Sequence, residues 1–312
     1  MVGGGVQVVT GTGVVGRLLV STGPLWALAA LLLGFAVVPW TGSFVFGDSD
    51  FEMLPARLDW GLLFALAMLS FSSAVRAWAE IAHPDSAVAL TGIRRVARIL
   101  ASGVALWLSI LPMVMVFQTL RLSEMAHLQD SLWTFSALGL AWTFPAWGIL
   151  FNPLAALVFL ASAMMHAGLP PFDIRGAEEE LAGGRITDTP VPGSLTWSLS
   201  DRLRALLIAG VASVIFLGGG DVPFFSQASI TAFTERFFGS GVGNLLSLLV
   251  HLVTFIVKVA LVLGLQRGLS QVMGHVRFEP VINLCWRGLV PLAFLDVVIT
   301  GLVLSWRGGV GS

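Results

Sequence analysis

Four carboxylates stand within eight residues of one another, directly after a long hydrophobic run, at Asp173, Glu178, Glu179 and Glu180. The whole chain of 312 residues has only 18 acidic residues, so this gathering is unusual. Carboxylates crowded beside an apolar surface repel one another and exchange protons readily. The stretch therefore predicts a site that responds to a change of charge nearby. The simpler interpretation is a solvated loop.

Lys258 is the only lysine in the chain, and the other sixteen of the 17 basic residues are arginine. It lies in an apolar segment, where an ionisable side chain is costly unless it is paired or hydrated. A lysine can lose its proton when desolvated, whereas an arginine effectively cannot. We expect Lys258 to belong to a proton relay, with His251 on the same helix face, unless the ammonium extends to the membrane surface.

Three further ionisable residues in apolar segments are candidates for the same relay: Glu80, His166 and Asp296. Each has a structural alternative. Glu80 follows Arg76 by four residues, so the two can form an ion pair on one helix face. His166 can cap a helix or lie at an interface, and Asp296 can accept hydrogen bonds from a neighbouring helix.

The composition indicates a polytopic membrane protein, because 56% of the residues are hydrophobic and only 11% are charged. The single cysteine, Cys285, excludes an internal disulfide and any multi-cysteine metal or iron–sulfur site, so we expect no metal in this chain and redox cofactors on other chains. The net charge of -1 does not indicate a nucleic-acid partner. The first charge is Arg17, so no cleavable signal peptide is expected.

The long apolar runs predict an all-α transmembrane helix bundle with about seven spans, because about 20 apolar residues are needed to cross a bilayer. We expect one domain over 21–306, preceded by an interfacial or disordered segment, 1–20. The predicted spans are 22–40, 60–80, 98–120, 147–168, 203–219, 244–266 and 285–306.

Loop charges predict the orientation, because arginine and lysine are enriched in cytoplasmic loops. Arg95 and its arginine neighbours place the 81–97 connection inside, and the 121–131 connection then lies outside. The 267–287 loop, with Arg277 against Glu279, is again predicted to be cytoplasmic.

The 131–168 segment must then cross the membrane once, with 131–146 along the interface or against a partner. The acidic loop, 170–202, falls on the cytoplasmic side of a membrane that we expect to be the bacterial inner membrane.

The acidic stretch resembles a known family pattern. Pro171-Phe172-Asp173, followed by Glu178, Glu180 and Leu181, resembles P-F-D-x-x-E-x-E-x-E-L in the H-type membrane subunit (subunit 1 in mitochondria) of the proton-pumping NADH:quinone oxidoreductase, respiratory complex I. Related membrane-bound hydrogenases share this architecture. Four other places match in the same order, so the resemblance covers roughly 20–306. They are Gly92-Ile93-Arg94-Arg95, the run Phe216 to Pro223, Lys258, and Arg277-Phe278-Glu279 with Trp286-Arg287.

The resemblance implies a subunit at the junction between a cytoplasmic iron–sulfur arm and a membrane arm. Its partners would be the other membrane subunits, the iron–sulfur subunits and lipid. It places Asp173, Glu178 and Glu180 in a loop that faces a quinone cavity, and Lys258 on a charged axis. Quinone would bind at an interface with partner subunits, and this chain alone would hold no cofactor and no catalytic residue.

The chain also departs from the family pattern. The first helix and the R-x-G-P-N motif, which help to form the quinone entrance, are not visible. Ser102-Gly103-Val104 replaces S-Y-E, and Gly176 replaces the first glutamate of the acidic motif. Alternatives therefore stay open: a membrane anchor of an energy-converting hydrogenase, a degenerate structural paralogue, or a stand-alone secondary transporter. No internal repeat supports the transporter.

Overall fold

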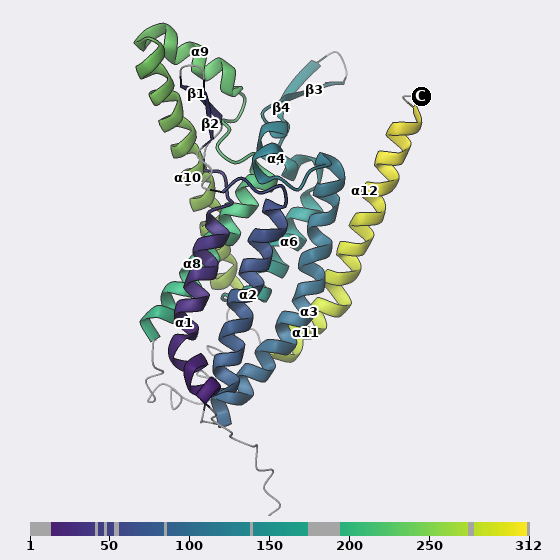
Figure 1. Cartoon of the computed structure of the whole chain (residues 1–312). Coiled ribbons are helices and arrows are strands. Elements are labelled where there is room, and N and C mark those ends of the chain that lie inside the picture. Colours follow the sequence, from purple (N-terminus) through teal and green to yellow (C-terminus); the bar gives the residue numbers. More distant parts are fainter. Residues whose placement is uncertain are drawn as a thin grey trace, which may run out of the picture.

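The computed structural model describes residues 14–40, 43–46, 49–52, 56–83, 86–137, 140–173, 194–273 and 278–310 (Figure 1). Within these ranges the chain is a bundle of long helices, which confirms the all-α class predicted from the apolar runs. The long helices are α1 (Val14–Phe35), α2 (Gly61–Ile81), α3 (Ser86–Phe117), α6 (Pro153–Ala167), α8 (Ser194–Leu217), α10 (Ser240–Met273) and α12 (Val290–Val310).

Shorter helices connect the long ones. They are α4 (Leu122–Gln129), α5 (Gly148–Phe151), α9 (Gln227–Phe238) and α11 (Phe278–Leu284). A π-helical turn, η1 (Cys285–Leu289), joins α11 to α12 and makes them one continuous rod. The 131–168 segment supplies the four-residue α5 and the 15-residue α6, which is one of the shorter apolar helices.

Two β-hairpins were not predicted. Strand β1 (Ser43–Phe46) pairs antiparallel with β2 (Ser49–Glu52), and β3 (Leu132–Ala137) pairs antiparallel with β4 (Leu140–Pro145). The second hairpin occupies the segment expected along the membrane interface. Its strands are rich in aromatic residues and threonine, which favour extended backbone, and each is only six residues long.

Packing sets apart an inner group of helices from two outer ones. Helix α2 packs against α1 and α3, and α8 packs against α1, α6 and α10. The core between them includes Leu66, Leu106, Phe159 and Ile215. Over its apolar span α2 buries 56% of its residues, whereas the spans of α10 and of the α11–α12 rod bury only 28% and 22%. The outer helices therefore present broad apolar faces, as lipid or a partner helix requires.

Four described helices are long and apolar enough to cross a membrane, and α1 and α6 contain shorter apolar helices. Helix α8 is apolar after a charged first half. Together these helices support an integral membrane protein. The α2–α3 turn, the end of α6 and the start of α8 lie at one end of the bundle, and α9 and both hairpins lie at the other (Figure 1).

Candidate functional site

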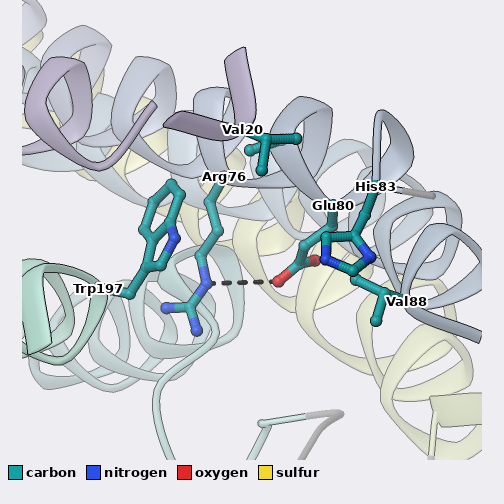
Figure 2. Close-up of a pocket in the computed structure, with 7 residues that line it drawn as sticks. Val20, Arg76, Glu80, His83, Val88 and Trp197 are labelled. Carbon is teal, nitrogen blue, oxygen red and sulfur yellow. Dashed lines mark ion pairs between the residues drawn. The ribbon is translucent and has the colours of Figure 1, made fainter. Parts of the chain in front are cut away.

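A small pocket at the α2–α3 end reaches a buried ion pair (Figure 2). Nε of Arg76 lies 3.4 Å from Oε1 of Glu80, which confirms the predicted pairing of these residues on one helix face. The guanidinium also lies 5.4 Å from the ring centroid of Trp197, on α8. The pocket volume is about 10 Å³. It therefore has room for about one water molecule beside the ion pair.

Glu80 is shared between two arginines of different helices. Besides Arg76, Arg95 on α3 donates to both of its carboxylate oxygens, from Nε at 2.8 Å and from Nη2 at 3.0 Å. Both partners are buried. Paired, charge-assisted bonds of this kind are the strongest that a carboxylate makes with protein groups. Any protonation of Glu80 would have to break them.

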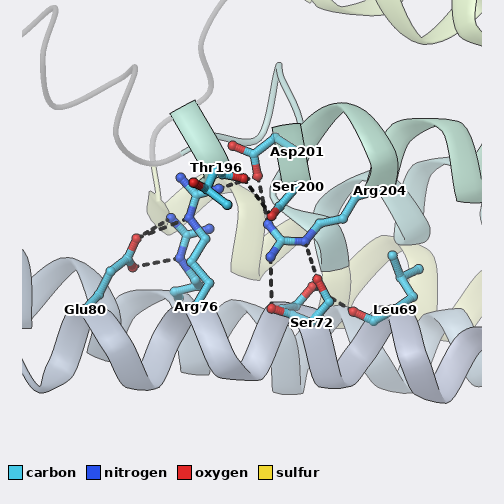
Figure 3. Close-up of polar contacts among 10 residues, drawn as sticks. Leu69, Ser72, Arg76, Glu80, Thr196, Ser200, Asp201 and Arg204 are labelled. Atoms are coloured by element: carbon cyan, nitrogen blue, oxygen red, sulfur yellow. Dashed lines mark hydrogen bonds and ion pairs between the residues drawn. The ribbon is translucent and has the colours of Figure 1, made fainter. Parts of the chain in front are cut away.

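Asp201, near the start of α8, continues the network (Figure 3). Its carboxylate accepts from Arg76 and, at 2.8 Å, from Nη1 of Arg204. Arg204 is completely buried and donates at 2.9 Å to both the hydroxyl and the backbone carbonyl of Ser72. We call Arg76, Glu80, Arg95, Asp201 and Arg204 the arginine cluster.

Helix periodicity explains how α2 supplies its share of the cluster. Ser72, Arg76 and Glu80 follow one another at four-residue intervals and so lie along one stripe of α2. Asp201 and Arg204, three residues apart on α8, face that stripe (Figure 3).

The residues that lead into the acidic stretch contact a second buried arginine of α3. Nη1 of Arg98 donates to the carbonyl of Phe172 at 3.0 Å, and the next residue is Asp173. Within the described ranges, Nε and Nη2 of Arg98 have no hydrogen-bond partner. Gly168 ends α6 with a positive φ of 70°, and a side chain there would strike Arg98. The backbone before the acidic stretch is thus fitted around this guanidinium.

His166 lies beside this arginine, on the inward face of α6. Its Nε2 is 2.9 Å from the hydroxyl of Ser70, and its Nδ1 is 3.5 Å from that of Ser102. Of the four acids in the stretch 173–180, only Asp173 falls within the described residues, where its side chain is half-buried. Glu178, Glu180 and Arg277 lie outside them, and Glu279 is described only as part of helix α11.

Lys258 is buried between α10 and the turn that follows α8. Its ammonium donates to the backbone carbonyls of Leu217, at 2.5 Å, and Asp221, at 2.6 Å, and lies 4.6 Å from the ring centroid of Trp147. Two glycines with positive φ, Gly218 and Gly219, shape this turn. The ammonium is therefore bound by carbonyls of the protein itself.

His251 contacts the same turn, as its place on the Lys258 face of α10 predicts. Its Nδ1 lies 3.0 Å from the carbonyl of Gly220. Within the described ranges, Nε2 of His251 and Oδ2 of Asp221 are buried without a hydrogen-bond partner. We call Trp147, Asp221, His251 and Lys258 the lysine cluster. It combines a cation, a carboxyl and an imidazole, which are the groups that a proton relay needs.

Comparison with known proteins identifies the family. A protein-family model described as NADH dehydrogenase matches residues 12–301. The chain belongs to the NADH dehydrogenase family. This confirms the resemblance inferred from the acidic stretch and its collinear motifs.

Similar proteins include three bacterial H subunits of NADH-quinone oxidoreductase. The second H subunit of Geobacter sulfurreducens is 28% identical over 287 residues, which are 91% of this chain and 74% of that protein. The H subunit of Bdellovibrio bacteriovorus is 24% identical, over 90% of this chain and 77% of its own length. The first H subunit of Cytophaga hutchinsonii is 23% identical, over 89% and 74%. This NADH dehydrogenase family member is thus similar to subunits of an oxidoreductase complex.

The sequence did not single out Asp201, Arg204 or Asp221. Arg204 was detectable, because it falls inside the predicted span 203–219, where a buried charge requires a partner. The prediction that Arg95 belongs to the 81–97 loop is wrong, because α3 begins at Ser86 and carries both Arg95 and Arg98 into the bundle. In the described part of the chain, no group of three or more histidine, cysteine or acidic residues is placed to hold a metal ion.

The pKa of the Asp221 carboxyl provides a test of whether the lysine cluster is buried. It lies in the connection after α8, and burial, followed by the nearby Asp130, raises its pKa to about 7, while Lys258 opposes the rise. In the unfolded chain an aspartate has a pKa of about 3.9. The contribution of Asp221 to the stability of the folded protein is therefore complete below about pH 4 and is lost as the pH rises through about 7.

We expect the wild-type Tm in detergent to fall, relative to that of Asp221→Asn, between pH 4 and pH 8. The asparagine variant removes the titration and keeps the shape, so the two curves serve as a matched pair. His251 and Asp130 also lie near this carboxyl and titrate in both proteins. A Tm difference that is constant with pH would contradict the burial of a titrating Asp221.

Proposed function

We propose that this chain is the membrane subunit at the junction with the cytoplasmic redox arm of a complex-I-like NADH:quinone oxidoreductase, and that it helps to couple electron transfer to proton translocation. The observation that carries the proposal is the position of Asp173. The first acid of the stretch follows the Phe172 carbonyl that Arg98 binds, at the end of the bundle that holds the arginine cluster. A change of charge on the acidic loop would act on this buried network.

The proposal keeps the predicted organisation of one domain, 21–306, with the acidic loop on the cytoplasmic face of the bacterial inner membrane. The predicted loop 170–202 is too long at its end, because α8 begins at Ser194. Flavin and iron–sulfur centres belong to partner chains. Glu80 and His166 connect the loop with the bundle, and Lys258 belongs to the charged axis toward the neighbouring membrane subunits.

A groove at the end of α6 suits a quinone at this junction. It has a volume of about 600 Å³ and lies between the end of α6, α8 and α10. Leu206 and Leu263 line it together with Asp201 of the arginine cluster. Gln266 also lines it, and its buried Nε2 has no hydrogen-bond partner among the described residues. A quinone carbonyl accepts such a bond, while the apolar walls suit its ring and tail.

The proposal is tested by Glu180→Gln in the complete complex, reconstituted into vesicles with a pH-sensitive dye. We expect proton uptake per NADH oxidised to fall at least about twofold, because the substitution removes one charge of the coupling loop. Glu179→Gln is the matched control: it also removes one charge, but at a position where the family pattern has no fixed glutamate, so it should change the ratio little.

Equal ratios for both variants and the wild type would contradict a coupling role for Glu180. If the chain purified alone and transported a solute in vesicles, the proposal that it is a subunit of a larger complex would be contradicted. A secondary transporter would then be favoured.

A membrane anchor of an energy-converting hydrogenase is the second candidate. Val104, which is 41% exposed on α3 at the place where the family pattern has a carboxylate, fits instead a degenerate structural paralogue. The chains that copurify decide between the two: an NADH-oxidising flavin module supports the first proposal, and a nickel-containing large subunit supports the second.

A further inference from the structure

A groove with a volume of about 650 Å³ opens on the side of the bundle where α12 meets the end of α3 and α5. Its walls are mostly apolar, and one carboxylate, Asp296, also lines it. Helix α12 contacts α3 and α6, whereas α10 and the lysine cluster pack against α8. This groove is therefore separate from the site described above. The apolar residues that line it include Phe117, Phe151, Leu154, Ile299 and Val303.

Asp296 is 4% exposed, and only one of its oxygens is bonded. Oδ1 accepts from Nδ2 of Asn152 at 2.8 Å, and the same amide nitrogen lies 3.2 Å from Oγ1 of Thr300. The other end of Asn152 caps α6 by accepting from the backbone of Ala155 at 2.9 Å. Both N–H groups of Asn152 are therefore used, and Oδ2 of Asp296 has no hydrogen-bond partner among the described residues.

No described basic side chain contacts this carboxylate. The arginines of the cluster are held by Glu80, Asp201 and Ser72, and Lys258 is held by two backbone carbonyls on the α8 side. A buried carboxylate with an unused oxygen is costly in an apolar setting, and a cation from outside the chain would offset that cost. A second copy of this chain is a poor source of that cation, because its own buried arginines and lysine would be bound in the same way.

Asp296 lies well inside the apolar span of the α11–α12 rod, which favours a side chain of another helix as its partner. The apolar span runs from Pro280 to Trp306, so ten residues separate Asp296 from the nearer end. At 1.5 Å per residue this is about 15 Å along the helix. A basic side chain on a neighbouring apolar helix could lie at this level of the span, and a lipid headgroup is kept as an outcome of the test below.

We propose that the groove receives a transmembrane helix of a neighbouring subunit and that a lysine or arginine of that helix pairs with Asp296. The apolar walls match the surface of such a helix, and the α11–α12 span is the least buried of the four long spans. The proposal does not depend on quinone binding or on proton coupling. It requires only that the chain works within an assembly of membrane subunits.

The test is photo-cross-linking in the native membrane complex. A benzoylphenylalanine replaces Val303, which lines the groove, or Phe294, which is exposed on α12 but does not line it. We expect the Val303 probe to label one transmembrane helix of a partner that contains a lysine or arginine, and the Phe294 probe not to label that helix.

The charge is then removed by Asp296→Asn, with Thr300→Val as a control that alters the same hydrogen-bond group but keeps the carboxylate. We expect the asparagine variant to lower the labelling yield at least about tenfold and the valine variant to lower it little. Exchange of the two charges, Asp296→Lys with the partner's basic residue changed to aspartate, should restore the yield.

Three results would overturn the proposal: a label found only on lipid, a label on another copy of this chain, or a labelled helix without a basic residue. Full labelling in Asp296→Asn would do the same. The cross-link in the protein with an intact Asp296 gives an answer even if the asparagine variant does not fold. Proton pumping is not a readout, so failure here is distinct from failure of the proposed function.

Discussion

Replacing Glu80 with alanine is expected to lower the free energy of unfolding by about 3–5 kcal/mol, because removal of one partner from a buried ion pair leaves an uncompensated charge. Here the loss affects two arginines. Arg95 loses both of its bonds to the carboxylate, and Arg76 loses one of its two ion-pair partners among the described residues and keeps Asp201. Unfolding of the purified protein by denaturant in detergent measures the change.

Two variants control for this prediction. Glu80→Gln keeps the shape and one acceptor oxygen, so it should cost less than alanine. Glu124→Ala removes an exposed carboxylate that is bonded to Thr119, and it should change stability by less than about 1 kcal/mol. If Glu80→Ala and Glu124→Ala were equally stable, the arginine cluster would not be a structural element of the bundle.

Replacing Lys258 with methionine is expected to reduce proton pumping by the assembled complex about tenfold. Methionine fills a similar volume but offers no proton and no charge, so the carbonyls of Leu217 and Asp221 lose their donor. Pumping and NADH oxidation are measured on the same vesicles, and assembly is checked by the subunits that copurify.

Thr254→Val is the matched control for this variant. It changes a residue one helical turn away on α10, whose hydroxyl bonds only to the helix backbone. Lys258→Arg keeps the charge but cannot release a proton, so it should resemble methionine in pumping and the wild type in assembly. Normal pumping in Lys258→Met would remove the lysine cluster from the relay.

The sequence was sufficient where one helix carries both partners. Arg76 and Glu80 pair, and His251 and Lys258 face the same turn, because the 3.6-residue period alone determines which side chains share a face. The order of the long helices also followed from the apolar runs, although only four of the described helices are long and apolar enough to cross a membrane.

Contacts between helices could not be read in this way. Asp201 reaches Arg76 across 125 positions, and Asn152 reaches Asp296 across 144. Such pairs depend on which faces the helices turn toward each other, and a charge pattern in one helix does not encode that rotation. The β3–β4 hairpin was missed for a different reason: its composition is as apolar as that of a span, so only the shortness and aromatic content of its strands distinguish it.

The π-helical turn η1 determines the rotation of α12. Cys285 and Leu289 lie within this turn and point into the bundle, as do Ala293 and Asp296 after it. A π turn holds one residue more than an α turn, and each residue adds 100° of rotation. Deletion of Gly288 would convert it to regular α-helix and leave Asp296 facing Asn152, whereas deletion of Leu292 would turn the carboxylate by about 100°. Because of this wide turn, the rod can lose one residue while the side chains of α12 keep facing the same neighbours.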